Sequence, residues 1–249
     1  MKLIDNPRGN YRFLPGIRAH GSGAIADPGY EVVHVVLRKP VPYAEGFKKI
    51  ERHLERRQRP KQALCGIELR LPKALTFEQF AAANQGYCAL LESWDLFVDG
   101  INPIARTNIA PVLDPPSEWM LYAFSYTRVS SRKGPSFVVA GAGDLLTQDL
   151  SNHRIIRKGE TSADAMREKA AHVFGVLGER LRALGVAWHH VTAVDLVSAF
   201  PVTPAMLEQV MQPMRRQSLH GVHWFYARPP IIDLDFEADT RGVAVELRI

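Results

Sequence analysis

The sequence predicts an α+β protein made of two successive units, each a mixed sheet with two helices packed on one face. The order strand, helix, strand, helix, strand, strand can be read twice along the 249 residues. Between the two readings, the small and basic residues SSRKG at 130–134 interrupt the apolar periodicity. We therefore expect an N-terminal extension leading into the first unit (residues 1–29), a first unit (30–129) and a second unit (130–249).

In the first unit, stretches rich in β-branched and apolar residues alternate with longer amphipathic segments. Thr76 followed by Gln79 fits a capping box, which predicts a helix that begins at Thr76. The expected elements are strand 31–37, helix 43–58, strand 63–71, helix 76–94, strand 104–112 and strand 119–127.

The second unit repeats this order and has its own helix signals. Thr203 before Pro204 fits an N-cap with proline at the first helical position, and Gly185 fits a left-handed helix end. The expected elements are strand 137–143, helix 162–184, strand 190–200, helix from 204 to about 215, and strands 221–227, 231–239 and 242–249. One apolar stripe marks the long helix: Met166, Ala170, Val173, Phe174, Leu177, Leu181 and Leu184.

Composition limits the function classes. With 46% hydrophobic and 23% charged residues, the chain has an ordinary globular composition. No apolar run approaches the roughly 18 to 20 residues of a membrane span, and no secretory signal is visible, so we expect a soluble cytoplasmic protein. Cys65 and Cys88 are expected to be reduced thiols. The net charge of +5 is dispersed among glutamates, which favours a solvated surface over nucleic-acid binding.

The most informative polar pair lies in NPIARTNIAP, residues 102–111. Arg106 and Asn108 are two apart in a predicted strand, so both side chains project from the same sheet face. An arginine there suits a carboxylate ligand, because its planar donors match a carboxylate in bidentate fashion. The alternative is a solvated arginine or a structural ion pair. We find no metal-binding frame and no dinucleotide fingerprint, and we expect neither a metal nor a cofactor.

The unit order and several local motifs resemble the Rid family of reactive-intermediate deaminases, which have a chorismate-mutase-like fold. In the first unit, FEQFAAANQGYCALL is similar to the family's helix with an asparagine beside the pocket, which implies a substrate-binding role for Asn84. NPIARTNIAP is similar to its proline-alanine-arginine strand, which places Arg106 at the carboxylate-binding arginine. PGIRAHGSGA is similar to the glycine-proline-tyrosine segment at the pocket entrance, with His20 in place of tyrosine.

The second unit departs from the family pattern at the site. It has no equivalent arginine strand, but the family's water-orienting glutamate corresponds to a position near Asp235 in IDLDFEAD, residues 232–239. The resemblance therefore implies a composite site in which Arg106 faces Asp235 or Glu237, from the same chain or a neighbouring one. In a strand, Asp233, Asp235, Glu237 and Asp239 would share one face, and the alternative is that this face is simply wet.

PRGNYRFLPG, ALCGIELR, NPIARTN and Pro115–Pro116 further resemble the two-domain 2-aminomuconate and 2-amino-5-chloromuconate deaminases of nitroaromatic and aminophenol degradation. This resemblance implies hydrolysis of an enamine or imine dicarboxylate to a 2-oxo acid and ammonia, without metal or cofactor. Arg18 would bind the second carboxylate, and His20 would relay protons. It also implies a homo-oligomer, a trimer or hexamer.

Two other functions stay open at this point. One is a chorismatase-like lyase or hydrolase, since such proteins also combine Rid-like domains. The other is a non-catalytic Rid-like protein that binds a ligand, which would be favoured if no acidic strand lay within reach of Arg106. Fold resemblance alone cannot choose among these functions.

Overall fold

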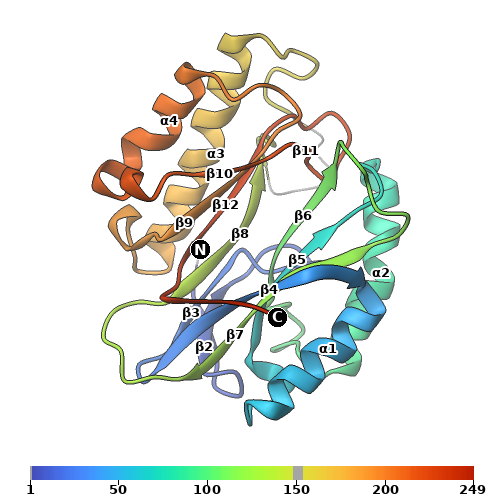
Figure 1. Cartoon of the computed structure of the whole chain (residues 1–249), viewed down its shortest axis with the longest axis vertical. Helices are drawn as coiled ribbons and strands as arrows, with labels where there is room; N and C mark the ends of the chain where they lie inside the picture. Colours follow the sequence, from blue (N-terminus) through green and yellow to red (C-terminus); the bar gives the residue numbers. More distant parts are fainter. Residues whose placement is uncertain (1, 148–153) are drawn as a thin grey trace.

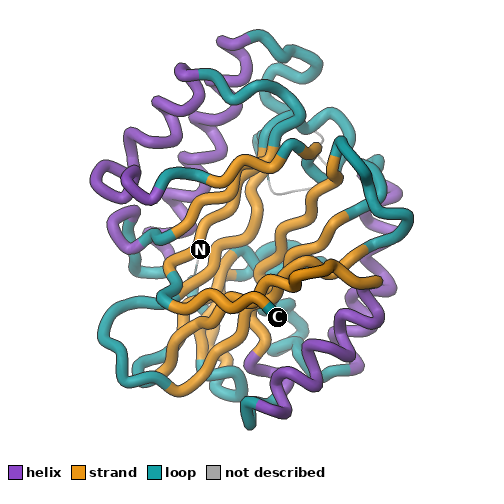
Figure 2. Tube along the Cα trace, in the orientation of Figure 1, coloured by secondary structure: helices purple, strands orange, loops and turns teal. Residues whose placement is uncertain are grey.

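A computed structural model describes residues 2–147 and 154–249 and has an α+β architecture with two mixed sheets (Figure 1). The strands form the middle of the molecule, and the helices lie on its two outer sides (Figure 2). The predicted order of elements is confirmed for both halves, with the helix ends within two residues of their expected positions. No helix of the described residues has both the length and the apolarity to cross a membrane.

The first sheet has the strand order β11-β6-β5-β7-β4-β13. Helices α1 (Tyr43–Arg56) and α2 (Phe77–Ser93) pack on one of its faces. Its strands are β4 (Tyr30–Pro42), β5 (Leu64–Arg70), β6 (Ala105–Pro111), β7 (Met120–Val129), β11 (Ala227–Arg228) and β13 (Val245–Arg248).

The second sheet has the order β1-β2-β3-β8-β12-β9-β10. Helices α3 (Ala163–Ala183) and α4 (Pro204–Met214) pack on its outer face. Its strands are β1 (Ile4–Asn6), β2 (Tyr11–Leu14), β3 (Gly23–Ala26), β8 (Phe137–Gly143), β9 (Ala193–Val197), β10 (His223–Phe225) and β12 (Glu237–Gly242).

The predicted helix signals form as expected. The Thr76 hydroxyl accepts a hydrogen bond from the Gln79 amide, and the Gln79 side chain accepts one from the Thr76 amide, which completes the capping box. The Thr203 hydroxyl caps α4 through the Met206 amide. Gly185 has a φ of +77° just after α3, a conformation that favours glycine. The apolar stripe of α3 is buried along its whole length.

The sheets do not follow the expected unit boundaries. The N-terminal extension supplies β1, β2 and β3 to the second sheet, where β3 pairs with β8. The last strand, β13, was expected in the second unit but pairs in parallel with β4 of the first sheet. The predicted strand 221–227 divides between β10 in the second sheet and β11 in the first. These exchanges tie the two halves together through backbone hydrogen bonds.

A third core lies between the sheets and is built from small and aromatic side chains of both. Among its members, Ala24 and Ala140 come from the second sheet, and Cys65 and Ala105 from the first. The Gly141 amide donates to the Thr107 hydroxyl at 3.1 Å across this contact. Each sheet therefore covers much of the helix-free face of the other within a single chain.

Candidate active site

A pocket opens where α2, β6, β8 and the start of β12 meet, and we call it the Arg106 pocket. Figure 1 shows β6 and β8 running beside one another at this point. With its mouth to solvent included, the pocket holds about 600 Å³ of empty space. It is lined by Ile17, His20, Phe80, Arg106, Asn108, Gly141, Ala142, Gly143, Leu145, Pro230, Ile231, Leu234 and Glu237.

Strand alternation on β6 positions Arg106. Ala105 joins the core between the sheets, so its neighbour Arg106 projects to the other face, toward α2. Its guanidinium carbon lies 4.5 Å from the centre of the Tyr87 ring and 5.6 Å from that of Phe80. Arg106 is 3% exposed, and burial lowers its pKa. An arginine remains charged under these conditions, so the pocket contains a buried cation.

Arg106 and Asn108 both have polar atoms without a protein partner. Neither terminal nitrogen of Arg106 has a hydrogen-bond acceptor among the described residues, and Asn108 lacks partners for both its amide oxygen and its amide nitrogen. Burying such groups without partners costs about 1–3 kcal/mol each. Arg106 and Asn108 lie on the same face of β6 and both line the pocket. Their unpaired polar atoms indicate a site in which a polar ligand supplies the missing hydrogen bonds.

Glu237 supplies the acidic group of the pocket. It is the first residue of β12, is 5% exposed and lines the same cavity as Arg106. Burial raises its pKa to about 8, the charge of Asp144 acts in the same direction, and Arg180 and Arg106 oppose it. At neutral pH, Glu237 therefore holds its proton and can donate it, and after donation it can accept a proton.

Gly141 makes room for the Glu237 carboxyl. A Cβ atom built on Gly141 would overlap Oε1 of Glu237 and come within 3.3 Å of the Thr107 methyl group. Any larger residue on this part of β8 would displace the carboxyl. Gly141 is therefore part of the geometry of the site, although it has no reactive group.

His20 lines the pocket as a neutral imidazole. Its Nδ1 donates to the Gly21 carbonyl at 3.0 Å, which leaves Nε2 as an acceptor. Burial lowers its pKa to about 3, assisted by the positive charges of Arg106 and Arg180. His20 can therefore accept a hydrogen bond in the pocket, but it does not change charge near neutral pH. A proton relay through a charged imidazole, as expected for it, does not fit this environment.

Asp235 is held in a buried ion-pair cluster outside the pocket lining. Lys169 contacts both Asp235 and Asp144, the latter at 3.1 Å, and both the lysine and Asp144 are fully buried. The Asp144 carboxylate also accepts hydrogen bonds from the backbone amides of Asp235 and Phe236. The acid expected to orient water at position 235 is thus committed to a structural role.

This cluster corrects the predicted strand 231–239, because regular strand begins only at Glu237. The backbone amides of Asp235 and Phe236 donate to the Asp144 carboxylate and not to a neighbouring strand. Asp233 has a φ of +75°, which is incompatible with a strand. Asp233 is exposed and pairs with Lys158 at 2.8 Å, whereas Glu237 and Asp239 are buried. The expected acidic face therefore holds only for Glu237 and Asp239 within β12, and the alternative of a wet face holds only for Asp233.

Arg18 and Asn84 lie outside the pocket lining. The Arg18 side chain is 71% exposed and pairs with Glu92 at 2.6 Å, so the expected second cation for a dicarboxylate is not placed in the pocket. The side chain of Asn84 is buried one turn after Phe80 in α2, and its amide donates to the Phe80 carbonyl at 2.8 Å. Its Oδ1 has no partner among the described residues, as in Asn108.

Sequence reasoning missed Lys169 and Arg180, which are both fully buried on α3. Arg180 donates to the Ala140 carbonyl at 2.8 Å and its charge lowers the pKa of Glu237. A signal was available, because Lys169 lies three residues after Met166 and Arg180 three after Leu177, within the apolar stripe. A charge inside such a stripe indicates a buried ionic partner.

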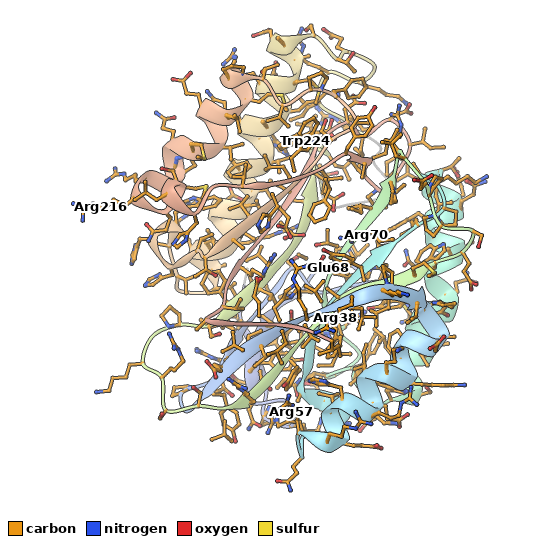
Figure 3. All side chains as sticks on the ribbon, in the orientation of Figure 1. Arg38, Arg57, Glu68, Arg70, Arg216 and Trp224 are labelled. Atoms are coloured by element: carbon orange, nitrogen blue, oxygen red, sulfur yellow. The ribbon has the colours of Figure 1, made fainter. Side chains whose placement is uncertain are left out.

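A second group of titratable side chains, most of them buried, lies against the opposite face of β6, and we call it the Asp195 network. Figure 3 labels two of its members, Glu68 and Arg70, near the middle of the molecule. Glu68 and Arg70, two residues apart on β5, form an ion pair at 3.5 Å. The network comprises His34, Glu68, Arg70, Asp195, His223, Asp239, Arg241 and Glu246.

The charges of the Asp195 network are paired within the protein. Arg241 binds Asp195 at 2.8 Å and Glu246 at 2.7 Å, and His223 donates to Asp195 at 2.9 Å. Burial acts to raise the pKa of Asp195, but His223 and Arg241 hold it at about 2. Oxygens of Glu68, Asp195 and Asp239 lie within 4.8 Å of one another, so burial and its acidic neighbours raise the pKa of Asp239.

Comparison with known proteins gives one family and a few relatives. Residues 3–247 match the family model described as 2-aminomuconate deaminase CnbZ. A 2-amino-5-chloromuconate deaminase from Comamonas testosteroni is 36% identical over 244 residues, which cover 96% of this chain and 95% of that protein. A chorismatase crystal structure gives a TM-score of 0.47 at 11% identity, over 98% of this chain and 80% of the other. A candidate endoribonuclease from Thermotoga maritima gives 0.30 at 17% identity, over 54% and 91%.

Proposed function

The chain belongs to the 2-aminomuconate deaminase family, and from this premise we propose that the Arg106 pocket hydrolyses a 2-aminomuconate-type enamine to a 2-oxo acid and ammonia. The observation that carries the proposal is the buried guanidinium of Arg106, whose terminal nitrogens have no hydrogen-bond partner in the part of the chain that the structure describes, in one cavity with Glu237. A substrate carboxylate would pair with Arg106, and Glu237 would transfer the protons that the reaction requires.

Arg106 and Asn108 would bind the carboxylate next to the reacting carbon. The terminal nitrogens of the guanidinium match two carboxylate oxygens, and the Asn108 amide has both a free donor and a free acceptor on the same strand face. Bound in this way, the carboxylate neutralises a buried cation that is otherwise unpaired. The adjacent C=N carbon becomes more electrophilic in the field of Arg106.

Glu237 would move the protons. In its protonated form it donates a proton to carbon, which converts the enamine to the iminium ion. The resulting carboxylate takes a proton from water as the water oxygen adds to the C=N carbon. It then returns that proton to the leaving nitrogen and takes the hydroxyl proton as the carbinolamine collapses to the 2-oxo acid and ammonia, which restores the protonated Glu237. His20 would hold the water or the amine through its unprotonated Nε2.

The remaining wall of the pocket fits the carbon chain of such a substrate. Phe80, Leu145 and Leu234 line it with apolar surface, and Arg106 is the one cation in its described lining. A planar diene would lie against this wall, and its distal carboxylate would point to the pocket mouth and water. This arrangement replaces the expected contact with Arg18.

We also interpret the two halves as diverged Rid-like units, with the functional site formed where they meet. The repeated order of elements and the position of Arg106 support this interpretation. Arg106 comes from the first half and Glu237 from the second, so a single chain supplies both groups. A trimer or hexamer stays a prediction, and the pocket described here does not depend on it.

The function is tested with purified protein and freshly generated 2-aminomuconate, by measuring ammonia release and the loss of substrate absorbance. We expect Arg106→Leu to lower kcat/KM by about 10²- to 10³-fold, because a charge-assisted bidentate contact is lost. Arg18→Leu, an exposed arginine outside the pocket, serves as the control and should keep wild-type activity.

Wild-type turnover in the Arg106→Leu variant would exclude Arg106 from the site. Binding of the substrate by the wild-type protein without ammonia release would instead favour the non-catalytic ligand-binding function. The lysine variant Arg106→Lys separates charge from geometry, because it keeps a cation but loses the planar pair of donors.

A further inference from the structure

A groove remote from the Arg106 pocket has five lysines and arginines among its nine lining residues, and we call it the basic groove. It lies between the end of β4, one face of α1 and residue Ile249, which Figure 1 shows together beside the C-terminus. With its opening to solvent included, the basic groove holds about 1260 Å³ of empty space. Its charged and titratable lining consists of Arg38, Lys39, Lys49, Arg52, His53 and Arg56.

Two local features bring these residues together. The pairing of β4 with β7 is interrupted between Val36 and Val41, and this irregular stretch carries Arg38 and Lys39. Figure 3 shows Arg38 where β4 meets the C-terminal strand. On α1, the four titratable residues at 49, 52, 53 and 56 follow the i, i+3, i+4, i+7 spacing, so they share one face of the helix.

The groove concentrates like charges that form no ion pair with the residues that the structure describes. None of its five lysines and arginines lies within 4.0 Å of a carboxylate of the residues that the structure describes. The acidic side chain of Glu51 on α1 pairs with Lys61 at 2.6 Å, outside the groove. Arg52 and Arg56 are one helical turn apart and repel each other. Such convergence raises the free energy of the folded state unless an anion neutralises it.

His53 adds an unsatisfied donor or acceptor at the same place. Its Nε2 is buried and has no hydrogen-bond partner among the described residues, while its ring packs edge-on against Phe124 and Tyr126 at 5.3 and 5.1 Å. Burial lowers its pKa, and the charges of Arg57 and Arg56 lower it further. The imidazole therefore lies in a positive field that a bound anion would weaken.

We propose that the basic groove binds an anion that carries two or more linked phosphate groups. Five cations from two separate segments exceed what one carboxylate needs, and they match a chain of phosphates in charge. His53 is the only aromatic side chain in the described lining, and its ring is packed against Phe124 and Tyr126, so the groove offers no open aromatic platform on which bases of a single-stranded nucleic acid could stack. The phosphate chain itself is the recognised chemistry.

The test is calorimetric titration of the full-length protein with inorganic tripolyphosphate, at fixed ionic strength. The variant Arg52→Gln/Arg56→Gln removes two charges from the groove. Its matched control is Arg215→Gln/Arg216→Gln, which removes two exposed charges elsewhere, and Figure 3 shows Arg216 on the far side of the molecule. We expect about 10- to 100-fold weaker binding for the groove variant and an unchanged control.

A local spectroscopic readout separates site binding from general charge attraction. Tripolyphosphate should raise the pKa of His53, measured by NMR with His53→Gln used for assignment, and leave the pKa of His20 in the other pocket unchanged. Absence of measurable binding would overturn the proposal. Equal weakening in both arginine pairs, or tighter binding of a single-stranded oligonucleotide than of tripolyphosphate, would overturn it as well. Deaminase activity of the groove variant should equal that of the wild type.

Discussion

The Arg106 pocket and the space beside the Asp195 network are both lined by β6, β8 and β12, and both contain a buried arginine and a buried carboxyl. They differ in how these groups are satisfied. Arg241 has two carboxylate partners at 2.7 and 2.8 Å, whereas the terminal nitrogens of Arg106 have none within residues 2–147 and 154–249. The space around the network is about 290 Å³, against about 600 Å³ in the pocket.

This contrast shows that burial of charge does not by itself identify a binding site. A buried charge with complete partners holds the fold together, because each group has been compensated within the protein. A buried charge without partners imposes a cost that only a ligand removes. We therefore expect mutations in the Asp195 network to lower stability and mutations in the Arg106 pocket to lower activity.

The largest expected difference is in stability. Arg241→Met should lower the free energy of unfolding by about 3–5 kcal/mol, because Asp195 and Glu246 lose their shared cation. Arg106→Met should leave it unchanged or raise it by about 1–3 kcal/mol, because an unsatisfied buried group is removed. Urea denaturation of both variants measures the difference, and equal destabilisation would break the comparison.

The next largest effect is on turnover, where we expect Glu237 and Asp239, two acids of β12, to differ. Glu237→Gln should lower kcat by about 10²- to 10⁴-fold, because the proton donor is lost. Asp239→Asn is the matched control, since Asp239 is a buried carboxyl of the same strand that lies outside the lining of the Arg106 pocket. In the wild type, kcat/KM should fall as the pH rises through about 8. A pH profile that is flat in this range, or an inactive Asp239→Asn, would contradict the assignment.

Stability should also depend on pH through Glu237. Its pKa is about 8 in the folded protein and near 4.5 when unfolded, so its stabilising contribution is complete below pH 4.5 and is lost as the pH rises through 8. Across this window, the wild type should lose up to about 1.4 kcal/mol per pH unit more than Glu237→Gln. Denaturation at several pH values gives both slopes, and parallel slopes would show that Glu237 is not held neutral.

A smaller effect is expected from the glycine beside Glu237. Gly141→Ala places a Cβ against the carboxyl and should lower kcat and cost about 1–3 kcal/mol of stability through overpacking. Gly175→Ala on α3 has open space around its Cβ and should be neutral or stabilising. Thermal denaturation and kinetics of the two alanine variants test whether space for Glu237 matters.

The smallest effect is expected at His20. With a pKa near 3, its imidazole stays neutral at working pH, so His20→Asn should lower kcat by less than about tenfold and leave the shape of the pH profile unchanged. If the wild-type pH profile changed slope near pH 6.5 and this change were lost in His20→Asn, the histidine would be shown to change charge during turnover.

Much of the local structure could be predicted because its causes are local. The caps at Thr76 and Thr203 and the stripe on α3 depend on residues a few positions apart, and all three form as predicted. The shared face of Arg106 and Asn108 follows from strand alternation. Glu237 could be proposed as an acid from a resemblance, but its separation from Asp235 could not, because the Asp144–Lys169 cluster joins segments far apart in sequence.

The sequence by itself determined the order of elements, their caps and the strand that carries the arginine. The tertiary structure decided which sheet each strand joins, since β3 and β13 both pair outside their own sequence unit. It also decided which charges are satisfied. Arg106 and Arg241 are both buried arginines on strands. Among the described residues, Arg241 pairs with two carboxylates, whereas the terminal nitrogens of Arg106 have no partner. The reason is that desolvation and pairing depend on contacts between distant segments, which no local pattern records.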